Sequence, residues 1–233
     1  MRFRSAALTV VIFAAAMAYL ESAVVVYLQR ALEISPDHLF PLSRPDMVAD
    51  LAAIEVGREF ATLVMLIGVG CLAGRRWVDR LAWTAVAFGV WDIGYYFWLW
   101  VFIGWPHSPV TWDVLFLIPV PWTGPVWAPI AISGFLIGFG LAAARQVGAG
   151  GMPRVSLVRG VAAVAGGLLV VGSFIANAPA LIAGDLPGMF PWPVFVAGVA
   201  VAAWAAAASL RTGALAAETL AGATTHRPLD GAA

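Results

Sequence analysis

Charged residues interrupt a stretch that is otherwise apolar enough to cross a bilayer, IEVGREFATLVML at residues 54–66. Glu55 and Glu59 are four residues apart, so on a helix they share one face, with Arg58 beside it. Glu21 and Asp92 stand in two further apolar stretches. Because a charged side chain at the centre of a bilayer costs at least about 2.5 kcal/mol, these residues predict a polar site inside a membrane.

The charge balance of this site indicates its chemistry. Four carboxylates, those of Glu21, Glu55, Glu59 and Asp92, face the single guanidinium of Arg58. An uncompensated carboxylate in a medium of low dielectric has to bind a proton, a cation or water. The alternative is a purely structural core, in which Arg58 pairs with Glu55 or Glu59 and fixes the helix register.

Supporting groups follow in the next apolar stretch and the segment after it. Tyr95 and Tyr96 lie one turn beyond Asp92, so we expect a phenol to donate to a carboxylate or a ligand, with Asp92 and Tyr96 as the pair. His107 and Asp113 follow, and we expect them to reach the carboxylates from outside the membrane core. The alternative for Asp113 is that it caps a short helix.

Three functions are compatible with these residues. Carboxylate oxygens suit one or two divalent metal ions or another cation, at a ligand site that can be catalytic on a lipid-soluble substrate. The same acids with Arg58 can instead serve a small proton-coupled transporter. The chain can also be an accessory structural subunit of a larger membrane complex. Haem is not expected, because the three histidines, His38, His107 and His226, all lie outside the apolar stretches.

Composition explains why these charges must be placed in a membrane. The 233 residues are 62% hydrophobic and only 11% charged, and their mean hydropathy is +0.90. The net charge is +0, so no nucleic-acid partner is expected, whereas the lipid bilayer is. The lone Cys71 excludes an intrachain disulfide.

Apolar stretches of spanning length predict six transmembrane helices, near residues 6–29, 47–73, 81–105, 125–144, 158–182 and 193–210. The first begins like a signal peptide but continues to Leu28, so we expect it to be retained. With six spans, ten arginines fall on the side of the termini and two, Arg30 and Arg44, on the other. The positive-inside rule then predicts cytoplasmic N and C termini in a bacterial cytoplasmic membrane.

The sequence therefore predicts an all-α integral membrane protein with an irregular, proline-rich outer segment between helices 3 and 4. Pro119, Pro121 and Pro125 forbid a continuous helix there, and the segment is too apolar for a solvated loop, so we expect a cap or a re-entrant segment. Residues 1–211 form the membrane domain and residues 212–233 a flexible cytoplasmic tail. Gly134 and Gly138 have the spacing for helix–helix association.

Overall fold

The computed structural model describes residues 3–32, 45–183 and 185–225. Within them the chain forms seven helices and two short strands. In chain order these are α1 (Phe3–Leu32), α2 (Pro45–Ala73), α3 (Trp77–Ile103), β1 (Trp112–Phe116), β2 (Trp122–Pro125), α4 (Trp127–Gly148), α5 (Leu157–Ile175), α6 (Ala178–Ile182) and α7 (Trp192–Thr225).

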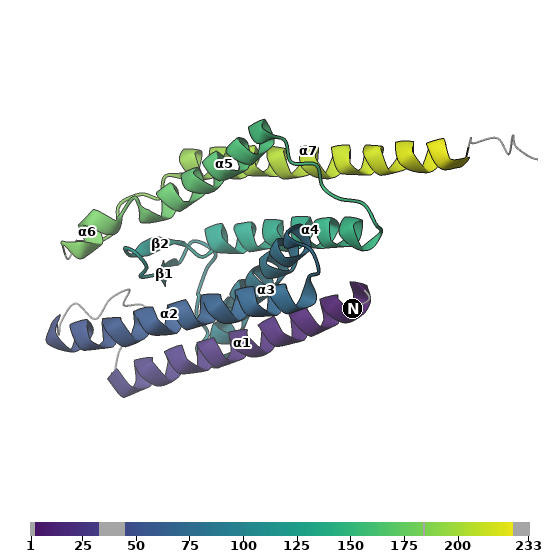
Figure 1. Cartoon of the computed structure of the whole chain (residues 1–233). Coiled ribbons are helices and arrows are strands. Elements are labelled where there is room, and N and C mark those ends of the chain that lie inside the picture. Colours follow the sequence, from purple (N-terminus) through teal and green to yellow (C-terminus); the bar gives the residue numbers. More distant parts are fainter. Residues whose placement is uncertain (1–2, 33–44, 184, 226–233) are drawn as a thin grey trace, which may run out of the picture.

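Six helices in the described part of the chain are long and apolar enough to cross a membrane, which confirms the predicted number. The apolar segments are Phe3–Ala31, Ala53–Ala73, Trp77–Ile103, Trp127–Gly148, Leu157–Ile182 and Trp192–Ala216. The short α6 continues the direction of α5 and belongs to the same segment (Figure 1). These helices indicate an integral membrane protein.

Helix α3 is the centre of one group of helices (Figure 1). It packs on α1, α2 and α4, while α5 and α7 form a separate pair alongside α4. Small residues on α1, among them Ala14 and Ala18, are fully buried and meet Val86 and Ala87 of α3 in one apolar cluster. The acids of α1, α2 and α3 are therefore carried on neighbouring helices.

Glycines permit the closest helix contacts, but not at the predicted pair. A Cβ atom on Gly166 of α5 would stand 2.7 Å from the Gly198 carbonyl oxygen of α7, and one on Gly89 of α3 would stand 2.5 Å from the Ser133 carbonyl oxygen of α4. A Cβ atom on Gly134 or Gly138 would meet no described atom within 4 Å. Helix association through Gly134 and Gly138 stays a prediction about contacts beyond this chain.

The segment between α3 and α4 is more regular than the sequence predicted. Helix α3 stops where Gly104 adopts φ 68° and donates its N–H to the Trp100 carbonyl at 2.9 Å. Strands β1 and β2 then pair antiparallel, with Trp112 opposite Pro125 and Phe116 opposite Trp122. The described chain is mostly helical, as predicted, but it has a two-stranded antiparallel sheet where an irregular segment was expected. The aromatic and β-branched residues of WDVLF favour a strand, which the prolines obscured.

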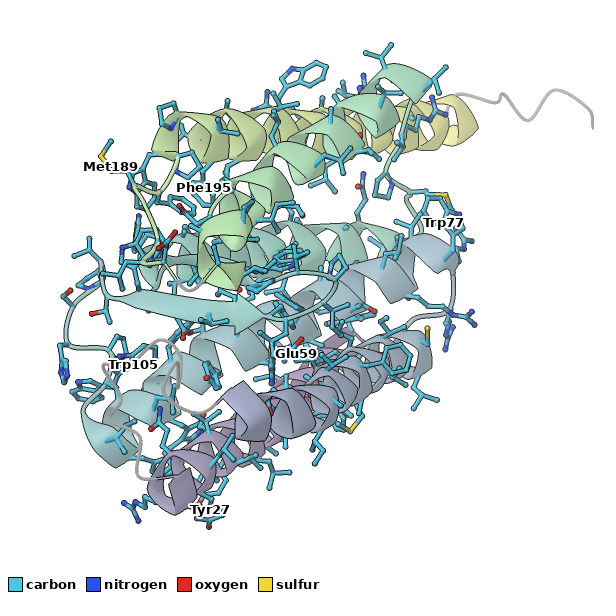
Figure 2. All side chains as sticks on the ribbon, turned by 90° about the vertical axis from the view of Figure 1, so that its left-hand side faces the viewer. Tyr27, Glu59, Trp77, Trp105, Met189 and Phe195 are labelled. Atoms are coloured by element: carbon cyan, nitrogen blue, oxygen red, sulfur yellow. The ribbon has the colours of Figure 1, made fainter. Side chains whose placement is uncertain are left out.

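The β1–β2 hairpin lies between the two groups of helices (Figures 1 and 2). On one side, the Phe116 ring packs 6.3 Å from the rings of Phe88 and Trp91, which stand near the middle of α3. On the other side, the Trp122 ring stacks 6.4 Å from Phe174 of α5. The hairpin therefore places non-helical backbone against the midsection of α3.

Helix α7 continues to Thr225, past the predicted end of the sixth span near residue 210. Residues 226–233, which include His226, lie outside the described residues, as does His38. The flexibility of the tail beyond Arg211 stays a prediction.

Candidate functional site

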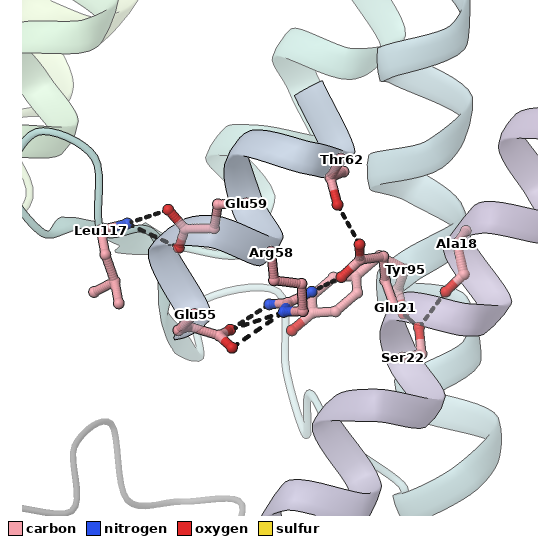
Figure 3. A network of polar contacts seen from close by, with 9 residues as sticks. All are labelled: Ala18, Glu21, Ser22, Glu55, Arg58, Glu59, Thr62, Tyr95 and Leu117. Atoms are coloured by element: carbon pink, nitrogen blue, oxygen red, sulfur yellow. Dashed lines mark hydrogen bonds and ion pairs between the residues drawn. The ribbon is translucent and has the colours of Figure 1, made fainter. Parts of the chain in front are cut away.

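Arg58 is the centre of the polar contacts between α1 and α2 (Figure 3). Its guanidinium forms an ion pair with Glu21 of α1 and a second one with Glu55, one turn earlier on α2. The Nε atom of Arg58 lies 3.1 Å from both carboxylate oxygens of Glu55. One guanidinium therefore pairs with two carboxylates. The structural alternative named Glu55 or Glu59 as its partner, and the structure adds Glu21.

Hydroxyl groups tie this cluster to its neighbours. The buried Thr62 donates its hydroxyl to the Glu21 carboxylate from one turn beyond Arg58. Ser22 donates to the Ala18 carbonyl at 2.8 Å and to the Tyr95 carbonyl on α3 at 3.0 Å. These bonds fix α1 against α2 and α3 at the level of the ion pairs.

Glu59 binds a different element from Glu55, although the two share a helix face. The Leu117 N–H at the tip of the hairpin donates to both carboxylate oxygens of Glu59, each at 2.9 Å (Figure 3). Glu59 is buried, and it lies between α2 and the hairpin (Figure 2). Sequence reasoning missed this partner, because a backbone donor in a distant segment leaves no residue-type signal.

The Asp92 carboxylate is hydrogen-bonded to a side chain of α4. The hydroxyl of Ser133 donates to its carboxylate at 2.8 Å, and both side chains are buried. Sequence reasoning did not single out Ser133. A lone hydroxyl in the apolar run WAPIAISGFLIG was the available signal.

Asp113 in β1, rather than Asp92, is the partner of Tyr96. The Tyr96 hydroxyl donates to one carboxylate oxygen of Asp113 at 2.9 Å, and the Val114 N–H donates to the other carboxylate oxygen of Asp113 at 2.8 Å. The predicted pair of Asp92 and Tyr96 was therefore wrong in its carboxylate, and Asp113 caps no helix. Removal from water raises the pKa of Asp113 from 3.8 to about 7, although both hydrogen bonds oppose the rise.

The two remaining supporting residues lie in different environments. The phenol ring of Tyr95 lies near the Arg58 guanidinium (Figure 3). It stacks on the indole of Trp91 at 6.4 Å and meets the Tyr96 ring edge-on at 5.3 Å. His107 is exposed, in the turn that precedes β1. Tyr95 therefore belongs to the cluster, and His107 stands at the surface of the molecule.

The predicted acids thus form linked groups rather than one pocket. Glu21 and Glu55 share Arg58, Glu59 and Asp113 hold the hairpin to α2 and α3, and Asp92 holds α4. Among the residues that the structure describes, no group of three or more His, Cys, Asp or Glu side chains is placed to hold a metal ion. Glu21 and Glu55 share one cation, and the other three carboxylates have hydrogen bonds from neutral donors.

Comparison with known proteins adds no assignment to this geometry. No protein-family model, no curated protein and no solved structure matches the chain.

Proposed function

We propose that the chain is a small proton-coupled transporter whose site lies between α1, α2, α3 and the hairpin. The observation that carries this proposal is the bond between Glu59 and Leu117. It joins a carboxylate near the middle of a membrane-spanning helix to backbone at the tip of a non-helical segment. Non-helical backbone at membrane depth is tolerated where it packs on protein or lines a cavity, and transporters place their substrate sites there.

The hydrogen-bond donors to each acid support proton coupling, because some of them are neutral and one is a cation. Glu59, Asp92 and Asp113 receive hydrogen bonds from an amide or a hydroxyl, whereas Glu21 and Glu55 receive the charge of Arg58. A carboxylate held by a neutral donor can gain or lose a proton without leaving a cation unpaired. We assign proton binding to the first three groups and the positioning of α1 against α2 to Arg58.

In this proposal the hairpin is a re-entrant segment that enters from the outer face of a bacterial cytoplasmic membrane, and both termini are cytoplasmic. The arginine asymmetry supports this orientation. A divalent cation at the same acids, with or without catalysis, is the competing function. A rise in the melting temperature of the purified protein with added Mg²⁺, Mn²⁺ or Zn²⁺ would support that competing function.

Charge displacement after pH jumps tests proton coupling without knowledge of the substrate. Proteoliposomes adsorbed on a solid-supported membrane should give a transient current when the external pH is stepped between 8 and 6, about the range in which perturbed carboxylates titrate. Glu59→Gln should lose most of this current. The matched control is Asp185→Asn, because Asp185 is an exposed acid outside the helices. No current from the unaltered protein, or an equal current from Glu59→Gln, would overturn the proposal.

A further inference from the structure

One hydrogen bond and a series of side-chain contacts connect α2, the hairpin tip and α3 in a closed ring. Glu59 receives the Leu117 N–H, the neighbouring Phe116 packs on Trp91, Trp91 stacks on Tyr95, and Tyr95 lies beside Arg58, which precedes Glu59 in the chain. We name this the acid–aromatic ring, made of Arg58, Glu59, Trp91, Tyr95, Phe116 and Leu117.

One side of the ring carries an excess of negative charge. One guanidinium stands against the three carboxylates of Glu21, Glu55 and Glu59, and its ion pairs are with Glu21 and Glu55. The partners of Glu59 are the backbone N–H groups of Leu117 and Ile118, which carry no net charge. An ammonium group is a stronger donor to a carboxylate than an amide and removes the charge imbalance. The acid side therefore favours a cationic ligand group.

The other side of the ring is aromatic. The indole of Trp91 lies between Tyr95, at 6.4 Å, and Phe116, at 6.3 Å, and Phe88 stacks on Phe116 at 6.3 Å with 22° between the planes. Aromatic faces attract organic cations and pack against apolar or aromatic bodies. This wall favours a ligand with an aromatic portion attached to its cationic group.

A third feature points to an acceptor on the ligand. Trp91 is only 8% exposed, and its indole N–H has no hydrogen-bond partner among the residues that the structure describes. The buried Nε1 of Trp122, whose ring lies 5.8 Å from Phe116 on the opposite side from α3, likewise has no described partner. Buried indole N–H groups usually find an acceptor. The unpaired Trp91 N–H therefore matches an acceptor oxygen on the ligand.

We infer that the acid–aromatic ring binds an aryl-bearing organic cation that also carries a hydrogen-bond acceptor oxygen. The ammonium group replaces the Leu117 N–H at Glu59, the aryl group packs on Trp91 and Phe116, and the oxygen accepts the Trp91 N–H. Binding displaces the hairpin tip from α2. This inference rests on the proposed function, because it names the substrate class of the proposed transporter.

Three compounds of nearly equal shape separate the two polar requirements. N-(2-aminoethyl)benzamide has the cation and the carbonyl acceptor, 4-phenylbutylamine has the cation alone, and N-(2-hydroxyethyl)benzamide has the acceptor alone. Calorimetric titration of the protein in nanodiscs should give the tightest binding for the first. Loss of the charge should weaken binding by about tenfold or more, and loss of the carbonyl by about two- to tenfold, as for charged and neutral hydrogen bonds.

Two variants assign these losses to residues. Glu59→Gln should weaken both amines and leave the neutral amide unchanged. Trp91→Phe keeps an aromatic ring but removes the N–H, so it should weaken N-(2-aminoethyl)benzamide and leave 4-phenylbutylamine nearly unaffected. Trp204→Phe is the matched control, since Trp204 is 55% exposed on α7. The elution profile and melting temperature of each variant check that it is folded.

The outcomes separate this inference from the proposed function. Equal affinity for the three compounds, binding of none of them, or equal losses for both amines in Trp91→Phe would overturn the ligand class, while pH-jump currents would still support proton coupling. The expected order of affinities without any pH-jump current would support the ligand site and overturn the transporter. The expected order of affinities together with a pH-jump current would support both the ligand class and the transporter.

Discussion

At the scale of single residues, Arg58 determines the charge balance between α1 and α2. Replacing Arg58 with Met leaves the buried Glu21 without its cation, so we expect the free energy of unfolding to fall by about 3 kcal/mol. Adding Glu21→Gln should restore much of this loss, because the Thr62 hydroxyl still has an acceptor. Unfolding in mixed micelles with increasing denaturing detergent measures both differences.

The control for Arg58 is an arginine that has no buried acidic partner in the described part of the chain. Arg145→Met changes an exposed side chain in the last turn of α4, and it should alter stability by less than about 0.5 kcal/mol. If Arg58→Met is as stable as this control, or if the double variant is no more stable than Arg58→Met, Arg58 does not hold Glu21 by charge.

Asp113 contributes to the pH dependence of stability, and replacing it isolates its share. Its pKa of about 7 in the folded protein lies above its ordinary 3.8, so the folded state binds a proton that the unfolded state releases. Stability should therefore fall as the pH rises from about 4 to about 7, by about 1.4 kcal/mol for each unit of pKa difference before screening by solvent. Asp113→Asn should flatten this part of the curve of melting temperature against pH.

The Tyr96 hydroxyl supplies a second test of the same group. It lowers the pKa of Asp113, so Tyr96→Phe should shift the sensitive pH range upward. Asp185→Asn should leave the curve as it is in the unaltered protein. A curve of unchanged slope in Asp113→Asn would show that other groups cause the pH dependence.

The sequence allowed the acids of the site to be predicted, but fewer of their partners. Isolated charges in apolar stretches singled out Glu21, Glu55, Arg58, Glu59 and Asp92, since burial of a charge needs a reason. The i to i+4 spacing placed Glu55 and Glu59 on one face, yet they bind different elements. Partners such as Ser133 and the Leu117 N–H depend on which helix and loop lie opposite, and local spacing does not contain that information.

At the scale of elements, the contact between α5 and α7 depends on glycine. In Gly166→Ala the new Cβ would stand 2.7 Å from the Gly198 carbonyl oxygen and 2.8 Å from the Ala202 nitrogen, both backbone atoms. The two helices would have to move apart, so we expect a loss of about 1–3 kcal/mol. Gly167→Ala is the matched control on the same helix, because its Cβ would meet no described atom within 4 Å. Equal melting temperatures for the two variants would contradict this packing.

The helices could be predicted from the sequence because length and hydropathy determine them almost alone. The hairpin could not, because its pairing joins residues across the turn 117–121, in which Pro119 and Pro121 suggest only an interruption. Its position between the helix groups depends on rings such as Phe116, Trp122 and Phe174, which come from separate elements.

At the scale of the whole molecule, the orientation in the membrane decides from which side the site opens. In a Cys71→Ser background, a cysteine in place of His107 should react with an impermeant maleimide added outside intact cells. A cysteine in place of Trp77, which is 65% exposed at the other end of α3, should react only after the membrane is opened. The reverse pattern would place the hairpin on the cytoplasmic side.

A carboxylate site closed by re-entrant backbone requires the hairpin tip to lie within the bilayer, so the depth of the tip decides whether the proposed site exists. A spin label at Val120, in the turn between the strands, would be compared with one at His107, both in the Cys71→Ser background. The collision rates with oxygen and with a water-soluble nickel complex give the depth of each label. We expect the label at Val120 to lie near the bilayer midplane, at the level of Glu59, and the label at His107 to lie at the surface. Equal access of the nickel complex to both labels would contradict the account.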